Sequence, residues 1–344
     1  MKDKLPVITT EVEEIGRYGA AVLTVTAKEF FSSGFEPGDI VEVTIGERRF
    51  TMPVGTAYTD VDNHKLIILK IDLDERMLVA LNYNDSFARD NGIRAGDKVT
   101  VSMKEKYGYI REYNLRSISM GGERDDYGSD EAFTNFRSVK AGNIVPGRLW
   151  RGFSPINPAD NRAFYADRLL SGTGVKTAIN LDGENEEKRA MYEGYSSSFY
   201  SGLTVVPVRM TFSPNDVAFP ENMKKVCLGI IENEGPYYIH CRYGRDRTGL
   251  VCIVLEGLCE ASMEEISADF MKSYENIHFL EPGSQKWLFQ REKRLFEPFN
   301  VLTGETADIN ADGEALSRLM RKILSDKCGL SEEEINEVHD RLCR

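Results

Sequence analysis

Short runs of alternating apolar and polar residues fill the first part of the chain, from Val7 to about Met103. Side chains on one face of a β-strand recur at every second position, so this pattern predicts a mostly β segment. The stretch GFEPGDIVEVTI at residues 34–45 returns as GIRAGDKVTVSM at residues 92–103, each copy with a Gly-Asp turn before its strand. This repeat predicts a β-barrel with pseudo-twofold symmetry. Three aspartates of the segment are expected to be turn residues rather than ligands: Asp39, Asp60 and Asp97.

A different pattern begins at Asn135, where apolar strands alternate with helical periodicity. VKTAINL at residues 175–181 and TVVPV at residues 204–208 predict buried strands, and Pro220 opens an amphipathic helix. Capping-box pairs precede two further helices, at Ser262 with Glu265 and at Ser331 with Glu334. The predicted fold class is α/β, with a parallel-rich sheet flanked by helices and a separate N-terminal β-barrel domain.

The stretch between these two patterns lacks periodicity and is rich in glycine, serine and acidic residues, as in SISMGGERDDYGSDEAF. Such a composition is typical of a linker. With 344 residues the chain is long enough for two domains that each bury a core. We therefore expect a β-barrel domain over residues 1–107, a linker over 108–133 and an α/β domain over 134–344.

The most informative stretch is YYIHCRYGRDRTGLVCIVLEG at residues 237–257. A strand ends at His240, a loop of polar residues and glycine follows, and a helical pattern resumes at Leu250. Within this loop Cys241 and Arg247 enclose five residues. A loop of this kind offers backbone N–H groups, a helix N-terminus and a guanidinium to one anion, and a phosphoryl group fits that space.

The residue types in this loop predict phosphoryl-transfer chemistry. Thiols beside helix N-termini and cations ionise readily, so we expect Cys241 to be a thiolate at neutral pH and a nucleophile. Arg247 would hold two phosphoryl oxygens while Cys241 attacks, which gives a phosphocysteine that water hydrolyses. Thr248 is expected to hydrogen-bond the sulfur. In the simpler alternative Cys241 is a buried thiol and Arg247 a surface residue. The predicted substrate-binding residues are His240, Arg242, Tyr243, Gly244 and Arg245.

The motif HCxxGxxRTG, here residues 240–249, resembles the signature of the protein tyrosine phosphatase superfamily. The resemblance implies this cysteine, this arginine and a covalent intermediate, without a metal or other cofactor. The stretches NFRSV, GRLWRG, ADFMKSYEN and GLSEEEINEVHDRL extend it to bacterial tyrosine phosphatases of the HCxxGKDRTG type, from Asn135 to the C-terminus. Tyr243 and Arg245 replace that family's usual alanine and lysine. Its DLRxxxE element is altered, and the role of that element is left open; its positions here are Asn180, Leu181, Asp182 and Glu186.

The barrel segment resembles another family. GFEPGDIVEVTI, TAYTDV at residues 56–61 and the segment 78–97 are similar to the β-barrel half of S-adenosylmethionine hydroxide adenosyltransferases. The larger α/β half of that family has no counterpart in this sequence. We therefore expect an adapted scaffold or a wall that faces the substrate, with nucleoside binding as an analogy only.

Two aspartates compete for the role of general acid. The leaving oxygen needs a proton and the attacking water needs a base, and one carboxyl group can serve both. Asp216 lies in the loop TFSPNDVAFP, where the superfamily that the chain resembles keeps its acid, and Asp246 lies in the phosphate loop itself. We expect Asp216 to be the acid and Asp246 to orient water or to be structural. In the simpler alternatives Asp216 caps a turn and Asp246 pairs with an arginine.

The sequence leaves the substrate open. Three arginines lie in the loop, Arg242, Arg245 and Arg247, more than a single phosphotyrosine needs. They favour an inositol polyphosphate, as in phytase-like enzymes, or a phosphoinositide, unless Arg242 and Arg245 merely face solvent. Tyr243 would stack on a ring or pack internally. The non-enzymatic alternative is a module that only binds phosphate, although binding alone does not require a thiol.

The composition of the chain limits the classes of partner and ligand that we expect. The net charge of -12 argues against nucleic acid, which needs a basic face. The histidines and cysteines show no metal-ligand spacing, and DINADGE at residues 308–314 has Leu319 where a calcium loop needs glutamate, so it predicts a helix cap. No apolar segment is long enough to span a membrane and no signal peptide opens the chain. Cytoplasm is expected, unless a leader was removed from a secreted protein, and the oligomeric state stays open.

Overall fold

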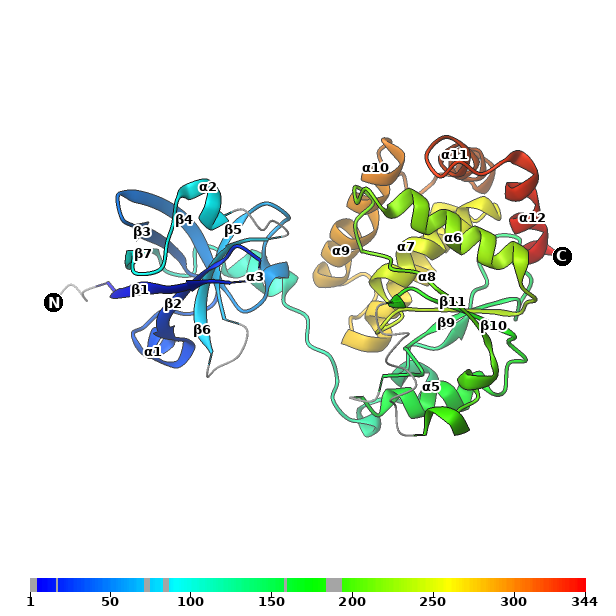
Figure 1. Ribbon diagram of the computed structural model, residues 1–344, viewed down its shortest axis with the longest axis horizontal. Helices are drawn as coiled ribbons and strands as arrows, with labels where there is room; N and C mark the ends of the chain where they lie inside the picture. Colours follow the sequence, from blue (N-terminus) through cyan, green and yellow to red (C-terminus); the bar gives the residue numbers. More distant parts are fainter. Residues whose placement is uncertain (1–4, 17, 71–74, 83–86, 158–159, 184–193) are drawn as a thin grey trace. The chain divides into compact units, whose positions relative to one another are not determined.

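A computed structural model describes residues 5–16, 18–70, 75–82, 87–157, 160–183 and 194–344 of the chain. The chain divides into two compact units, residues 1–118 and 119–344 (Figure 1). The expected linker over residues 108–133 is not uniformly unstructured. Its first part contains helix α3, Ile110–Arg116, in the first unit, whereas Tyr127 and Phe133 are buried in the second unit. The apolar surface of these two rings outweighs the polar composition that suggested a linker.

The first unit is a closed β-barrel with the strand order β1-β2-β6-β5-β4-β3-β7. Its interior is apolar, and the inward-facing residues of β3, which include Val41 and Val43, are fully buried. The mostly β segment is therefore confirmed, with short helices between some strands. The strands are β1 Val7–Ile15, β2 Ala21–Thr26, β3 Ile40–Ile45, β4 Arg48–Gly55, β5 Leu66–Leu69, β6 Arg76–Leu81 and β7 Lys98–Glu105, and the helices are α1 Ala27–Ser32 and α2 Phe87–Asn91.

The two copies of the sequence repeat form β3 and β7, which are neighbours in the barrel. Val43 pairs with Val101, its own counterpart in the repeat, so a local twofold axis passes between them. The turns match as well, because the carboxylates of Asp39 and Asp97 each accept a hydrogen bond from the backbone N–H three residues earlier, at 2.7 and 2.8 Å. Asp60 likewise binds backbone N–H groups of its own turn. The predicted twofold relation holds for β3, β7 and their turns but not for the whole barrel, because β4 and β5 pair parallel whereas β1 and β2 pair antiparallel. These aspartates stabilise turns.

The second unit is built on a sheet with the order β11-β10-β12-β9-β8, in which β8 alone runs antiparallel to its neighbour among the described strands. Helices α7 and α8 lie on one side of the sheet and α5 on the other (Figure 1). The strands are β8 Arg137–Ser138, β9 Leu149–Gly152, β10 Thr177–Asn180, β11 Thr204–Pro207 and β12 Tyr237–His240. The helices are α4 Asp130–Phe133, α5 Arg162–Leu170, α6 Phe219–Glu232, α7 Asp246–Leu258, α8 Met263–His278, α9 Gln285–Arg291, α10 Glu297–Thr303, α11 Gly313–Asp326 and α12 Glu332–Cys343.

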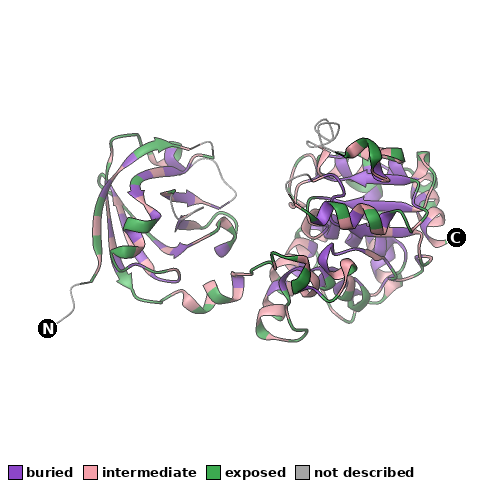
Figure 2. Cartoon of the chain, turned by 90° about the horizontal axis from the view of Figure 1, so that it is seen from below, coloured by how far each residue is buried: buried purple, intermediate pink, exposed green. Residues whose placement is uncertain are grey.

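Burial follows the layers of this unit. Strands β10 and β12 are buried at every residue, and α7 is buried from Thr248 to Leu258. Figure 2 shows buried residues in the interior of this unit. The prediction that residues 204–208 form a second buried strand is only partly right, because β11 lies at the sheet edge with Thr204 and Pro207 exposed. An edge strand tolerates proline, which has no N–H to donate.

The predicted helix starts are confirmed. Proline occupies the first turn of α6, and both capping boxes, ahead of α8 and α12, are formed. Asp312 accepts a hydrogen bond from the N–H of Ala315 and so caps α11, as expected from DINADGE. Within the described residues, each helix is too short or too polar to cross a bilayer.

Candidate active site

The loop from Cys241 to Arg245 joins β12 to α7 at the carboxyl end of a parallel strand, where ligand sites of open α/β sheets gather. Gly244 in this loop has a φ of +62°, and a Cβ at this position would lie 2.1 Å from the carbonyl oxygen of Gly152. Both the backbone conformation and the close contact exclude a side chain. The loop therefore needs glycine here.

In this loop the backbone carbonyl groups and the backbone N–H groups differ in their hydrogen bonding. The carbonyl oxygens of residues 241 to 245 each accept a hydrogen bond from the protein, and the donors are His240 Nδ1, Ser154 N, Asn135 Nδ2, Arg151 Nη2 and Gly249 N. In contrast, no described residue accepts a hydrogen bond from the N–H groups of residues 242 to 245. Consecutive N–H groups without partners, directly ahead of a helix N-terminus, are suited to bind an anion.

Arg247 extends from the first turn of α7, and Asp182 fixes its direction. Its Nη1 donates to Asp182 Oδ1 at 2.9 Å and to the carbonyl oxygen of Leu181 at 3.4 Å. Burial opposes the charge of Arg247, but nearby Cys241 and Asp182 raise its pKa above the usual value. Cys241, a residue that is 4% exposed, thus lies within electrostatic reach of the guanidinium.

His240 was predicted to bind substrate, but it is fully buried behind the loop. Its Nδ1 lies 3.3 Å from the carbonyl oxygen of Cys241, and its Nε2 lies 3.0 Å from the hydroxyl of Tyr200. Burial lowers the pKa of His240 to about 4, so the neutral ring donates through Nδ1 and accepts from Tyr200 through Nε2. The histidine positions the backbone of the cysteine and has no surface to offer a ligand.

Arg245 also departs from the expectation that it binds substrate. Its guanidinium binds both carboxylate oxygens of Asp246, contacts Nε2 of His278 and lies 5.3 Å from the ring centre of Tyr274. Tyr274 in turn donates its hydroxyl to Asp246 at 3.0 Å. Although burial acts in the opposite direction, Arg245 lowers the pKa of Asp246 to about 2. Both residues are occupied by these internal contacts, so the guanidinium nitrogens of Arg245 already have partners within the protein.

The remaining residues of the loop differ in exposure. Arg242 is exposed, and its guanidinium lies 5.2 Å from the ring centre of Tyr243. Tyr243 packs edge to face on Phe153 with 5.7 Å between ring centroids. This agrees with the second of the two alternatives for Tyr243, that its ring packs internally. Thr248 is fully buried, and its hydroxyl has no hydrogen-bond partner among the described residues. Buried hydroxyls without partners are uncommon, so this one at the start of α7 is a notable exception.

Asp216 lies in the loop ahead of α6 and binds that loop. Its Oδ2 accepts a hydrogen bond from Thr211 Oγ1 at 2.6 Å, and its Oδ1 accepts one from the N–H of Ala218 at 2.9 Å. The hydrogen bond from Thr211, and to a smaller extent the one from Ala218, lower the pKa of Asp216. In the described part of the chain, its carboxylate makes no hydrogen bond to the loop after β12.

Three residues at this site carried no functional prediction: Asp182, Asn135 and Arg151. Asp182 stood out in the sequence only as a departure from the DLRxxxE element, whose last position, Glu186, lies outside the described residues. Its place two residues after the end of β10, a strand that neighbours β12, is the signal that could have identified it. Asn135 lies in a turn just before β8 and Arg151 lies in the short strand β9, and no periodic pattern distinguishes a buried polar side chain there from an exposed one.

Comparison with known proteins supports the class of this unit. Residues 176–344 match the model of a family described as the tyrosine phosphatase family. The match includes the loop and Arg247, and it supports a relation to the protein tyrosine phosphatase superfamily and a phosphatase activity. No curated protein matches the chain. Among solved structures, an uncharacterized conserved protein from Thermotoga maritima is 22% identical with a TM-score of 0.26, over 29% of this chain and 40% of that chain. The match thus spans well under two thirds of that protein's length.

Proposed function

We propose that the chain is a cysteine-dependent phosphomonoesterase that acts through a phosphocysteine intermediate. The observation that carries this proposal is the loop after β12, whose carbonyl groups are all bound by the protein while its N–H groups have no described acceptor. Arg247, held by Asp182, supplies a guanidinium beside these N–H groups. The family match over residues 176–344 supports the same assignment.

In the proposed reaction the sulfur of Cys241 attacks phosphorus in line with the ester oxygen. The S–P bond forms while the P–O bond to the leaving group breaks, and the leaving oxygen takes a proton from a general acid. Water then attacks phosphorus and gives a proton to the same carboxylate, and the S–P bond breaks to release phosphate and thiolate. Arg247 and the loop N–H groups bind the equatorial oxygens in both steps. The hydroxyl of Thr248 is available to hydrogen-bond the departing sulfur.

Asp216 is the proposed general acid, because the alternative, Asp246, is already bound to Arg245 and Tyr274. The hydrogen bonds from Thr211 and Ala218 favour the ionised form of Asp216. To donate a proton, its carboxyl group has to leave these partners. We therefore include in the proposal a rearrangement of this loop when substrate binds.

Phosphotyrosine and inositol phosphates are the candidate substrates. Because Arg245 is bound internally, Arg242 is the exposed arginine of the loop. One additional guanidinium suits either an acidic residue next to a phosphotyrosine or a second phosphate on a cyclitol ring. The sequence offered three loop arginines in favour of a multiply phosphorylated substrate. Because Arg245 is bound internally, this argument is weaker. Turnover of a phosphotyrosine peptide, phytate and phosphoinositides under the same conditions decides between these classes, and a preference of orders of magnitude identifies the substrate class.

The proposed function is tested by phosphate release from p-nitrophenyl phosphate and from this panel. We expect release that vanadate inhibits and EDTA leaves unchanged, and a loss of roughly a thousandfold or more in Cys241→Ser. The matched control is Cys343→Ser on the last helix, which should keep its activity. Hydrolysis that survives in Cys241→Ser would overturn the proposal.

A module that binds phosphate without hydrolysing it is the alternative. Such a module would bind inorganic phosphate in this loop but would never form a phosphocysteine, which rapid acid quench and mass spectrometry detect.

The role of the barrel is a separate question. We propose that it is a scaffold or a wall that faces the substrate, and its similarity to S-adenosylmethionine hydroxide adenosyltransferases rests on sequence alone.

A further inference from the structure

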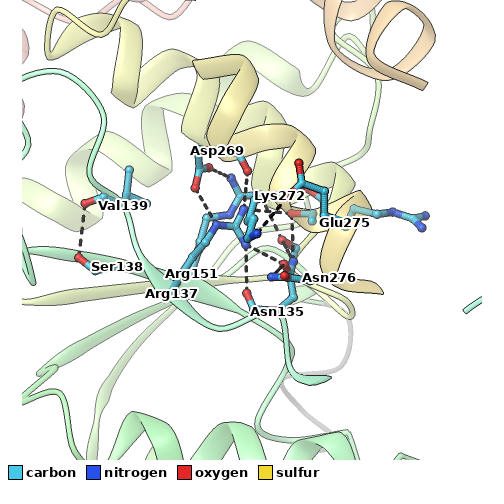
Figure 3. Close-up of polar contacts among 12 residues, drawn as sticks. Asn135, Arg137, Ser138, Val139, Arg151, Asp269, Lys272, Glu275 and Asn276 are labelled. Atoms are coloured by element: carbon cyan, nitrogen blue, oxygen red, sulfur yellow. Dashed lines mark hydrogen bonds and ion pairs between the residues drawn. The ribbon is translucent and has the colours of Figure 1, made fainter. Parts of the chain in front are cut away.

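A buried polar cluster lies beneath the loop and takes no part in the chemistry proposed above (Figure 3). Its centre is Arg151 on β9, which is fully buried. Arg151 forms an ion pair with Asp269 from α8, and Arg137 from β8 donates its Nε to the same carboxylate at 2.7 Å. Burying charged groups is unfavourable unless their partners are well placed. The contacts of this cluster with the loop indicate what it does.

Arg151 binds the loop from its inner side. Its Nη2 donates to the carbonyl oxygen of Gly244 at 3.1 Å and to that of Arg245 at 3.3 Å. Its Nη1 is held by Asp269, so the guanidinium has a fixed plane. One planar group therefore ties two consecutive loop carbonyls to α8. A carbonyl fixed toward the protein leaves the N–H group of the same peptide unit facing the opposite way.

Asn135 makes the second contact of this kind. Its backbone is left-handed, with a φ of +52°, and its side chain is buried. Its Nδ2 donates to the carbonyl oxygen of Gly244 at 3.0 Å and to that of Tyr243 at 3.4 Å. Its Oδ1 accepts from Arg137 Nη1 at 2.7 Å, which orients the amide so that nitrogen faces the loop. Figure 3 shows Asn135 below the two arginines, on the side away from Asp269.

The charge of the cluster adds to this geometry. Although burial opposes ionisation, Arg137 and Arg151 lower the pKa of Asp269, so the carboxylate stays charged. Burial, and then the carboxylate of Asp269, raise the pKa of the neighbouring Glu256 well above its usual value. Two guanidinium groups and one carboxylate leave a net positive charge behind the loop. In a buried region of low dielectric constant such a charge favours anions on the other side of the loop.

We propose that Arg151 and Asn135 are positioning residues that hold the loop carbonyls inward and thereby set the affinity of the loop for oxyanions and the ionisation of Cys241. The inference rests on the proposed function, because it assumes that the loop N–H groups bind a phosphoryl group. It goes beyond that function by assigning the control of the site to a buried cluster that makes no contact with substrate.

The test uses Asn135→Asp in the full chain. Aspartate keeps the shape of the side chain and tolerates the left-handed backbone, but its ionised carboxylate cannot donate to Gly244. Alkylation of Cys241 by iodoacetamide is followed by mass spectrometry across pH, with and without inorganic phosphate. We expect the phosphate concentration that gives half protection to rise about tenfold or more, and the midpoint of the pH dependence to move up by roughly half a unit or more.

The matched control is Asn233→Asp. The Nδ2 of Asn233 donates to the carbonyl oxygen of Gly229 at 2.9 Å, at the opposite end of β12 from the loop. The same chemical change there removes a hydrogen bond of the same kind, so it lowers stability without touching the loop. Phosphate protection and the midpoint of alkylation should both stay at the wild-type values. A shift in this control equal to that in Asn135→Asp would show a general loss of stability and overturn the proposal.

Arg151→Lys is the second variant and carries the test if Asn135→Asp does not fold. Lysine keeps the charge but cannot bind Asp269 and two carbonyls in one plane, so phosphate protection should weaken about tenfold although the charge is retained. If phosphate protects wild-type Cys241 and protects both variants equally well, the inference is overturned and the proposed function stands. If phosphate does not protect wild-type Cys241 at all, the proposed function fails with it.

Discussion

Arg247 and Asp182 meet across the ends of two neighbouring strands, with 2.9 Å between Nη1 of the arginine and Oδ1 of the aspartate. β10 and β12 are parallel and in register, and Asn180 lies opposite His240, so the residue two places after β10 lies beside the loop after β12. In the described residues only Nη1 of Arg247 has an acceptor. The two remaining guanidinium nitrogens stay available, and in the proposed reaction they are the edge that would bind two phosphoryl oxygens.

Removing this contact should slow catalysis more than it weakens binding. We predict that Asp182→Ala lowers kcat by about tenfold, because Arg247 loses the partner that orients it. KM should change little, since the loss of orientation is offset by the loss of a negative charge beside the bound anion. Asp182→Asn keeps an acceptor oxygen and should retain more activity than Asp182→Ala. Steady-state kinetics with p-nitrophenyl phosphate measure both values. An Asp182→Ala enzyme with wild-type kcat would contradict the positioning role.

The proposed acid can be separated from its rival by the choice of leaving group. We predict that Asp216→Asn lowers kcat by about a hundredfold or more for an alkyl phosphate, whose leaving oxygen needs a proton, and much less for p-nitrophenyl phosphate. The variant should also lose the basic limb of its pH–rate profile. Kinetics across pH with both substrates provide the measurement. If Asp216→Asn keeps full turnover at every pH while Asp246→Asn is inactive, the two assignments are reversed.

Asp246 should instead contribute to stability. Its pKa falls from 3.8 to about 2 in the folded state. A carboxyl group whose pKa is depressed by folding stabilises the protein above its unfolded pKa, and this stabilisation is lost as pH falls through the folded value. We predict that Asp246→Asn lowers the free energy of unfolding by roughly 2 kcal/mol at pH 7. Urea unfolding should show the difference from wild type shrinking between about pH 4 and pH 2, and a constant difference would contradict the ion pair.

His278 should make the free energy of unfolding depend on pH over a second, higher pH range. Burial and then Arg245 lower its pKa from 6.5 to about 4. The folded state holds the ring neutral, with Nδ1 toward the carbonyl oxygen of Ser119. Unfolding therefore takes up a proton between these two values, and stability present above pH 6.5 is lost as pH falls to about 4, by roughly 3 kcal/mol. We predict that His278→Gln, whose side-chain oxygen can still accept from Arg245, reduces this dependence in urea unfolding. His240 titrates in the same direction and should account for what remains.

The sequence indicated the backbone of the site more reliably than its side chains. The strand, loop and helix around Cys241 followed from local patterns, because hydrophobic periodicity and glycine placement are local properties. The partners of the loop arginines did not, since they come from distant elements. Arg245 contacts His278 from the end of α8, and Arg247 contacts Asp182 from the end of β10. Such pairings depend on how helices and strands pack, which spacing along the chain does not encode.

The same limit explains the linker. Residues 108–133 have the polar composition of a flexible segment, yet Arg162 of α5 binds the carbonyl oxygen of Phe133 at 3.1 Å and the hydroxyl of Tyr127 at 3.1 Å. Two buried rings and one distant arginine are enough to fix the second half of the segment on the second unit. A compositional argument averages over many residues and therefore does not detect a few buried contacts.

The barrel offers an internally controlled test of its repeat. Gly38 and Gly96 occupy equivalent turns, with φ of +91° and +89°. A Cβ at Gly96 would meet nothing within 4 Å, whereas one at Gly38 would lie 2.7 Å from Cδ1 and 2.8 Å from Cα of Ile110 in α3. We predict that Gly96→Ala lowers the free energy of unfolding by about 1 to 2 kcal/mol through backbone strain alone. Gly38→Ala should lower it by a further 2 kcal/mol or so, because the backbone of α3 has to move.

These two variants can be compared within the full chain because the units report through different signals. Both tryptophans, Trp150 and Trp287, lie in the second unit, so tryptophan fluorescence follows that unit and far-ultraviolet circular dichroism adds the barrel. In urea, the fluorescence transition should match wild type for both variants, while the barrel transition should shift further for Gly38→Ala than for Gly96→Ala. Equal shifts would mean that α3 does not pack on the turn at Gly38, since the two glycines share the same backbone strain and differ in that contact.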